Sequence, residues 1–132
     1  MFGNKPHAPA LSSRKIVAFV ATVDPGRARA FYEGALGLRL ITEDPFALVF
    51  DAGGTKLRVS VVRELTPPPY TIVGWMVPDI REAVRELAGR SVVFQRFDGL
   101  EQDEACIWAA PGGALVAWFR DPDGNTLSLT QT

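Results

Sequence analysis

The sequence predicts an α+β domain built from two βαβββ modules in one chain. An apolar stretch rich in β-branched residues and ending in an aspartate occurs twice, at 17–24 and at 72–79. A stretch with helical spacing of apolar residues follows each of them, and each half ends in a hairpin pattern, at 46–59 and 115–129. A length of 132 residues suits a single domain with a real core.

The first module is expected over residues 13–63. The expected elements are a strand at 15–23, a helix from Asp24 to Gly37, and strands at 38–42, 46–50 and 56–62. The first stretch is apolar on both faces, which is typical of a strand covered on both sides. Asp24 can cap the helix, and Gly37 can end it with a positive φ.

A proline-rich linker at 64–69 separates this module from the second, which is expected over residues 70–132. The expected elements there are a strand at 71–77, a helix from Ile80 to Gly89, and strands at 91–97, 114–120 and 126–130. Asp79 and Glu82 form a capping-box pattern at the start of that helix. The irregular stretch 98–112 makes the second module fifteen residues longer than the first between matching aspartates, and it is a candidate for specificity.

Composition narrows the class of partner and the compartment. Fourteen basic against fifteen acidic residues leave no positive surplus for nucleic acid. No apolar run approaches the length that spans a bilayer, and residues 1–12 lack the apolar core of a secretory signal, so we expect a tail there and no membrane partner. A single cysteine, Cys106, fits a reducing compartment, which favours a cytoplasmic protein, and it is expected to be a small packed residue.

The closing pattern Asp121-Pro-Asp-Gly-Asn with Thr-Leu-Ser-Leu after it, together with Phe31-Tyr32 and Leu36-Gly-Leu in the first module, resembles the vicinal oxygen chelate superfamily. That superfamily includes glyoxalase I, bleomycin-resistance proteins, fosfomycin-resistance enzymes and extradiol dioxygenases. The resemblance covers residues 15–131. It implies that the strands curl into a cup-shaped mixed sheet with the helices on the outer face, commonly completed by a homodimer. It does not imply one activity.

Enzymes of this superfamily hold a divalent metal with residues of the first and last strand of each module. The matching positions here are seven residues before the capping aspartates and seven after the first aspartate of each hairpin turn: Val17, Ile72, Arg58 and Ser128. None of the four is a normal transition-metal ligand, and the single histidine, His7, lies in the tail. We therefore expect no metal and no other cofactor.

Strand parity then predicts what lines the cup, since residues i and i+2 share a face. The alternation of Lys56, Arg58 and Ser60 with Leu57, Val59 and Val61 marks the Arg58 face as the one that meets water or a ligand. The expected ligand-binding residues are apolar and aromatic apart from one arginine and one serine: Val17, Phe19, Phe46, Leu48, Arg58, Ile72, Met76, Trp108, Trp118 and Ser128.

Three functions remain open at this point. The first is a metal-independent binding protein for an aromatic or amphipathic small molecule, with an anionic group paired to Arg58. The second is a glyoxalase-like lyase or isomerase acting on a small oxygenated substrate. The third is a structural or regulatory module whose cup is filled by its own Phe19, Phe46 and Trp118. No catalytic residue is nominated, because no triad, Cys/His pair or phosphate-binding loop is present.

Overall fold

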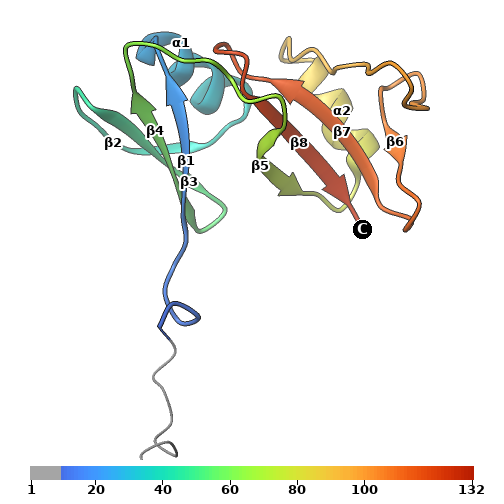
Figure 1. The fold of residues 1–132 in the computed structure, drawn as a ribbon, viewed down its shortest axis with the longest axis horizontal. Helices are drawn as coiled ribbons and strands as arrows, with labels where there is room; N and C mark the ends of the chain where they lie inside the picture. Colours follow the sequence, from blue (N-terminus) through green and yellow to red (C-terminus); the bar gives the residue numbers. More distant parts are fainter. Residues whose placement is uncertain (1–9) are drawn as a thin grey trace, which may run out of the picture.

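The computed structural model describes residues 10–132 and has the expected two-module α+β architecture (Figure 1). The first module consists of β1 (Val17–Thr22), α1 (Pro25–Arg29), η1 (Ala30–Ala35), β2 (Arg39–Glu43), β3 (Ala47–Ala52) and β4 (Thr55–Val61). The second consists of β5 (Thr71–Met76), α2 (Ile80–Ala88), β6 (Trp108–Ala109), β7 (Leu115–Arg120) and β8 (Thr126–Gln131). Each module therefore repeats one order of elements.

The strands form two separate four-stranded sheets with the same topology. Sheet 1 has the order β1-β4-β3-β2, and sheet 2 has the order β5-β8-β7-β6. In each sheet the first strand runs parallel to the last, and the other pairs are antiparallel. The single curled sheet that the resemblance implies is not closed within one chain. The edge strands β1 and β5 approach each other without pairing.

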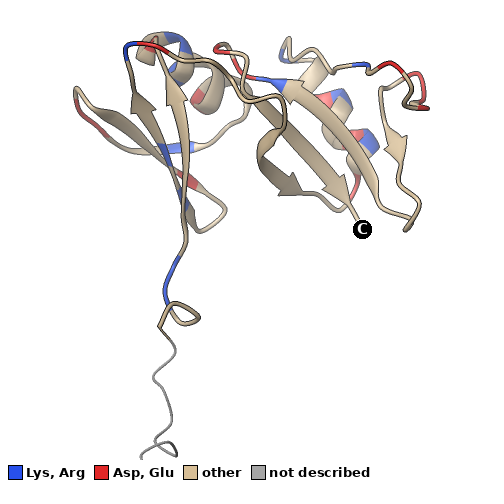
Figure 2. Ribbon diagram, in the orientation of Figure 1, with Lys and Arg blue, Asp and Glu red and all other residues tan. Residues whose placement is uncertain are grey.

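Each sheet is covered by helix on one side only. Leu57 and Val59 of β4, and Leu127 and Leu129 of β8, are buried on the helix side. These residues belong to one core cluster that runs through both modules. The opposite face of each sheet is open, and we call these two surfaces the open faces. The strands of sheet 2 carry almost no charge (Figure 2).

The first helix is shorter than its apolar spacing indicated, because it changes type. It begins at Pro25 with Asp24 as N-cap, whose Oδ1 accepts from the N–H of Arg27 at 3.1 Å. From Ala30 the chain widens into a π-helix, in which the N–H of Leu36 bonds the carbonyl of Phe31. Gly37 ends the helix with φ +74°, as expected.

The strand expected at 91–97 does not form. Phe94 makes one isolated bridge to Phe119, and the edge strand of sheet 2 is instead β6, in the stretch expected to be irregular. The side chain of Gln102 explains the difference, since it accepts from the N–H of Phe97 at 2.8 Å and donates to the carbonyl of Gln95 at 2.9 Å. These backbone groups are therefore not available for a ladder.

The Asp121–Asn125 turn ties the two modules together. Tyr32 Oη donates to Asp121 Oδ2 at 2.6 Å, and Asn125 Nδ2 donates to the carbonyl of Ala21 at 2.9 Å. Asp123 Oδ1 accepts from the N–H of Val23 at 2.9 Å. Burial, and next the neighbouring Asp121 carboxylate, raise the pKa of Tyr32 far above its usual range. The motif that indicated the family thus has a structural role here.

The segment before β1 extends away from the body of the molecule (Figure 1). Of its residues, Leu11 and Ile16 are 78% and 74% exposed. Most of the tail expected at 1–12 lies outside the described residues. None of the helices formed by residues 10–132 combines the length and apolar character needed to cross a bilayer.

Candidate functional site

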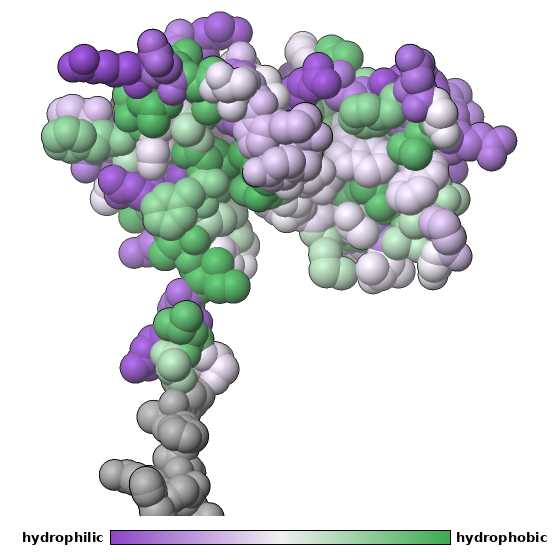
Figure 3. Space-filling model, in the orientation of Figure 1, coloured by the Kyte–Doolittle hydropathy of each residue, from purple (hydrophilic) through white to green (hydrophobic). Residues whose placement is uncertain are grey.

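The open face of sheet 1 is centred on Arg58. In the ladder Arg58 lies between Phe19 of β1 and Val49 of β3, so these three side chains form one row on that face. Phe19 is 61% exposed and Val17, two residues earlier, is 43% exposed. Exposed apolar atoms gather along β1 and the segment that leads to it (Figure 3). Arg58 therefore lies among apolar side chains at the centre of this face, and Lys56 lies on the same face nearer the hairpin.

Arg58 is half-buried and stands in none of the five ion pairs of residues 10–132. The same face also carries Asp51, which Arg39 contacts at 3.1 Å. The N–H of Gly54, and next the Arg39 guanidinium, lower the pKa of the Asp51 carboxyl. Asp51 is thus held ionised at the hairpin end of the sheet, where it is a poor proton acceptor.

The open face of sheet 2 has a matching row at the equivalent strands. Gly74 of β5, Ser128 of β8 and Trp118 of β7 lie opposite one another in the ladder. Ser128 is only 7% exposed. A Cβ on Gly74 would stand 2.5 Å from Ser128 Oγ, so glycine is required for the close approach. Arg58 and Ser128 therefore occupy equivalent centres of the two rows.

Aromatic side chains cover the rest of the open face of sheet 2. Trp118 packs edge to face with Phe97, with ring centroids 5.4 Å apart, and lies 5.9 Å from Trp108 in a tilted arrangement. Trp118 does not pack on Phe19 or Phe46 in this chain, and Phe46 is 73% exposed. The three aromatic residues expected to fill the cup are thus not in contact.

The ten residues expected to bind a ligand are spread over three environments. Leu48 is fully buried in the core, because its place in the ladder opposite Val59 puts it on the helix side, and a ligand on the open face cannot reach it. Ile72 is partly buried against the same core. Ser128 is also buried, whereas the other seven are exposed or half-buried. The eight divide between the sheets: Val17, Phe19, Phe46 and Arg58 lie with sheet 1, and Met76, Trp108, Trp118 and Ser128 with sheet 2.

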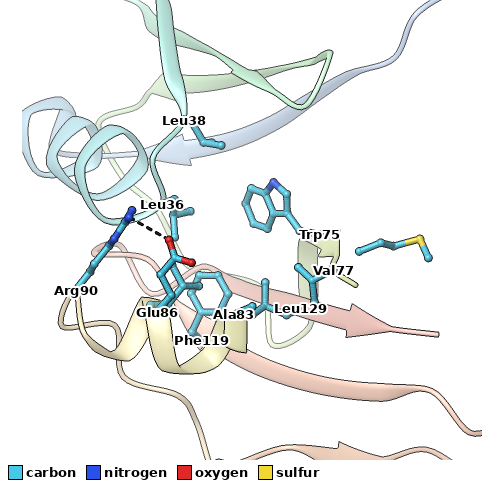
Figure 4. Close-up of a pocket in the computed structure, with 11 residues that line it drawn as sticks. Leu36, Leu38, Trp75, Val77, Ala83, Glu86, Arg90, Phe119 and Leu129 are labelled. Carbon is cyan, nitrogen blue, oxygen red and sulfur yellow. Dashed lines mark hydrogen bonds and ion pairs between the residues drawn. The ribbon is translucent and has the colours of Figure 1, made fainter. Parts of the chain in front are cut away.

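Cavities occur at three places along the described residues. One, of about 240 Å³, lies between the modules on the helix side and is lined by Leu36, Trp75 and Phe119, with the Glu86–Arg90 ion pair beside it (Figure 4). A second, of about 390 Å³, includes Trp108 and lies beside the stretch 98–112. A third, of about 570 Å³, lies where the linker meets sheet 2. None of the three is lined by Arg58, Phe19 or Ser128.

Comparison with known proteins decides the family. The family model described as the glyoxalase/bleomycin resistance protein/dioxygenase superfamily matches residues 15–129. The chain belongs to this superfamily. None of the curated proteins is detectably similar to it in sequence.

Solved structures of the superfamily share the fold at low sequence identity. A glyoxalase family protein from Bacillus anthracis superposes with a TM-score of 0.72 and 18% identity, over 89% of this chain and 93% of that one. Lactoylglutathione lyase from Agrobacterium tumefaciens gives 0.69 and 16%, over 90% and 93%. A bleomycin resistance determinant encoded on the transposon Tn5 gives 0.71 and 20%, over 89% and 97%. These likenesses concern the fold.

The residues present do not fit the metal that enzymes of this superfamily hold. The ladder places the Arg58 guanidinium at the centre of one open face, where a divalent cation would be repelled. Val17 and Ile72 are hydrocarbon, and Ser128 is a neutral hydroxyl. Within residues 10–132 no cluster of three or more His, Cys, Asp or Glu side chains could hold a metal ion.

Sequence reasoning missed three residues that line the cavity of about 570 Å³: Tyr70, Phe97 and Arg120. Arg120 follows Trp118 by two residues in β7, so strand parity puts it on the same open face as Trp118. Phe97 carried no such signal, because its position depends on the bonds from Gln102. Tyr70 depends on the path of the linker.

Proposed function

We propose that this superfamily member is a metal-independent binding protein for an aromatic or amphipathic small molecule with an anionic group. The open face of sheet 1 carries the proposal, since a half-buried arginine without an ion pair in residues 10–132 lies beside a phenylalanine that is 61% exposed. Exposed apolar surface beside the Arg58 guanidinium suits a ligand with an aromatic body and a negative group. The single cysteine supports a reducing, cytoplasmic setting.

The proposed site needs a second copy of the chain. Exposed apolar residues on both sheets, including Phe19 and Met76, would be left in water in a monomer. We propose a homodimer in which sheet 1 of one copy faces sheet 2 of the other. Arg58 of one chain and Trp118 of its partner would then enclose one ligand, and each dimer would hold two such sites.

Mixing two defective variants tests this arrangement. Anilinonaphthalene sulfonate, an amphipathic aromatic anion, serves as the fluorescent probe. We expect Arg58→Met and Trp118→Ala each to lose probe binding as homodimers. Refolding an equal mixture should restore about a quarter of the sites, because half of the dimers are mixed and each of these has one intact site. Arg85→Met, on the exposed side of α2, is the control that should bind as the parent does.

Two results would contradict the proposal. A mixture that regains no binding would mean that Arg58 and Trp118 do not act from opposite chains. A monomer by light scattering at micromolar concentration would remove the second copy altogether. Elemental analysis is the separate check on metal independence, and one zinc, nickel or manganese ion per chain in the purified protein would overturn that part.

A further inference from the structure

The cavity between the proline-rich linker and sheet 2 has the features of a separate ligand site, and we call it the linker cavity. Its walls come from the linker, the start of β5, the last residue of β7 and the turn before β8. A volume of about 570 Å³ lies within the range of known small-molecule sites. All of it is built by one chain, so it does not depend on a dimer. It therefore goes beyond the proposed site between Arg58 of one chain and Trp118 of its partner, which we call the composite site.

Arg120 is the one charged residue that lines the linker cavity. It is also the one charged residue in the four strands of sheet 2. It takes part in none of the ion pairs formed by residues 10–132. The neighbouring Asp121 carboxylate is buried and already accepts from Tyr32 and Asn125. The cavity therefore presents a positive charge with no acid lining it, which favours a monoanion.

The rest of the wall suits a flat ring. Phe97 and the 65% exposed Tyr70 supply aromatic surface, and Thr71 and Thr126 supply hydroxyl groups. Phe97 meets Trp118 edge to face at 5.4 Å, so a ring against Phe97 would change the surroundings of a tryptophan. Aromatic contact area contributes to affinity at a low cost in conformational entropy.

The cavity is also preformed. Three consecutive prolines, 67–69, stiffen the linker wall. Pro67 lies against the turn, since a Cβ on Gly124 would come within 3.2 Å of Pro67 Cγ. The turn itself is anchored to the first module through Asn125 and Asp123. A wall that is ordered before binding loses little entropy when a ligand enters.

We propose that the linker cavity binds a small aromatic carboxylate, with the carboxylate on the Arg120 guanidinium and the ring against Phe97 and Tyr70. A guanidinium pairs with a carboxylate through two parallel hydrogen bonds. A single cation compensates a single negative charge, which favours a carboxylate over a phosphate dianion. This ligand would lie at the linker end of sheet 2, next to the row of Trp118, Ser128 and Gly74.

Benzoate is the probe that tests the proposal. Titration is followed by amide chemical shifts of Thr71, Gly124 and Thr126 and by tryptophan fluorescence. We expect a dissociation constant of about 1 mM, a reasonable affinity for so small a ligand. Arg120→Gln should weaken binding by about 10-fold or more, because a charge-assisted hydrogen-bond pair is lost. Arg120→Lys keeps the charge but not the paired N–H groups of the guanidinium, so its affinity for benzoate should lie between those of the parent and Arg120→Gln.

Matched controls separate this cavity from the composite site. Arg85→Gln removes an exposed cation of α2 that lines neither site and should leave benzoate binding unchanged. Benzamide, which has the same ring without the charge, should not bind. If the composite site fails its own test while benzoate still binds in an Arg120-dependent way, the linker cavity stands by itself. If benzoate fails while the mixed-dimer experiment succeeds, only the linker cavity is lost.

Several outcomes would overturn the proposal. Equal affinity of Arg120→Gln and the parent would show that the guanidinium does not hold the carboxylate. Chemical shifts centred on Phe19 and Arg58 would move the ligand to sheet 1. Benzamide binding as tightly as benzoate would exclude recognition of the charge, and tighter binding of phenyl phosphate would exclude the carboxylate class. An unchanged circular dichroism spectrum of Arg120→Gln confirms that the exposed substitution leaves the fold intact.

Discussion

Tyr32 donates a hydrogen bond of 2.6 Å to Asp121, across 89 positions of sequence and across the two modules. Both residues are buried, and the carboxylate also accepts from the N–H and the side-chain amide of Asn125. Because the Asp121–Asn125 turn is bonded to the first module in this way, the two helix-covered faces share one core. The relative placement of the open faces depends on this contact.

Replacing Tyr32 with phenylalanine should destabilise the protein while preserving its fold. The hydroxyl donates to a buried carboxylate, so we expect a loss of about 1.5–3 kcal/mol in the free energy of unfolding. Urea denaturation measures this. Tyr70→Phe is the matched control, because Tyr70 is 65% exposed and its hydroxyl makes no hydrogen bond within the described residues. Equal stability of the two variants would show that the Tyr32–Asp121 bond contributes nothing net.

The same tyrosine should make the protein sensitive to alkali. Burial and the Asp121 carboxylate raise the pKa of Tyr32 in the folded state, whereas in the unfolded chain tyrosine ionises near pH 10. The contribution of this group is fully present below about pH 10 and is lost as the pH rises further, by up to about 1.4 kcal/mol per pH unit. We expect the parent to lose stability above pH 10 more steeply than Tyr32→Phe. Parallel plots of the free energy of unfolding against pH for the two proteins would contradict this.

Gly74 should not tolerate a side chain. A methyl group there would stand 2.5 Å from Ser128 Oγ, which is buried, so Gly74→Ala should cost about 1–3 kcal/mol. Adding Ser128→Ala should recover part of that loss, and a double-mutant cycle measures the coupling. Gly112→Ala, where no atom lies within 4 Å, is the control and should be nearly neutral. Independent, additive effects at 74 and 128 would show that the two residues do not clash.

Asp103 should order the long stretch 98–112. Its Oδ1 accepts from the N–H groups of Ala105 and Ile107, both at 2.9 Å, and its Oδ2 contacts Arg81 at 2.8 Å. Asp103→Asn weakens the two backbone bonds and breaks the ion pair, so we expect a loss of about 1–2 kcal/mol and altered Trp108 fluorescence. The exposed neighbour Glu104, changed to glutamine, is the control. An unchanged Trp108 signal in Asp103→Asn would contradict the assigned role.

Asp103 also gives the stretch a defined acid sensitivity. Burial acts to raise the pKa of this carboxyl, but the backbone N–H groups and Arg81 outweigh it and leave the pKa below its ordinary value. A lowered pKa stabilises the fold above the unfolded value of about 3.9, and this stabilisation is lost as the pH falls through the folded value. The free energy of unfolding, measured by urea denaturation at a series of acidic pH values, should therefore fall less steeply with decreasing pH in Asp103→Asn than in the parent.

Much of the fold followed from the sequence because its signals are local. Asp24 and Asp79 cap helices, Gly37 takes a positive φ, and the alternation around Arg58 matches the buried faces of Leu57 and Val59. The strand at 91–97 was wrong because Gln102, outside that stretch, takes the hydrogen bonds of Gln95 and Phe97. Strand periodicity reflects only the alternation of side chains, so it does not show that a nearby glutamine side chain takes these backbone groups.

The candidate site was less predictable than the fold. The resemblance placed Arg58, Ser128 and Trp118 on the open faces, and strand parity applied two residues beyond Trp118 would have found Arg120. Parity cannot show which sheet face meets which, so the single cavity shared by Arg58 and Trp118 stays a prediction that depends on a second chain. The prediction that Leu48 lies on the open face was wrong. Its neighbour Val49 is the residue that lies opposite Arg58, so Leu48 lies opposite Val59 on the helix side.

The sequence by itself determined the two modules, their helix caps and turns, the superfamily, and the replacement of all four metal-ligand positions. Those properties depend on residue type and spacing over short distances. Only the tertiary structure decided that the two sheets stay separate within one chain, that the Asp121 turn joins the modules through Tyr32, and that the linker and Arg120 enclose a cavity. The physical reason is that each of these depends on packing between residues distant in sequence, where many arrangements satisfy the same local pattern.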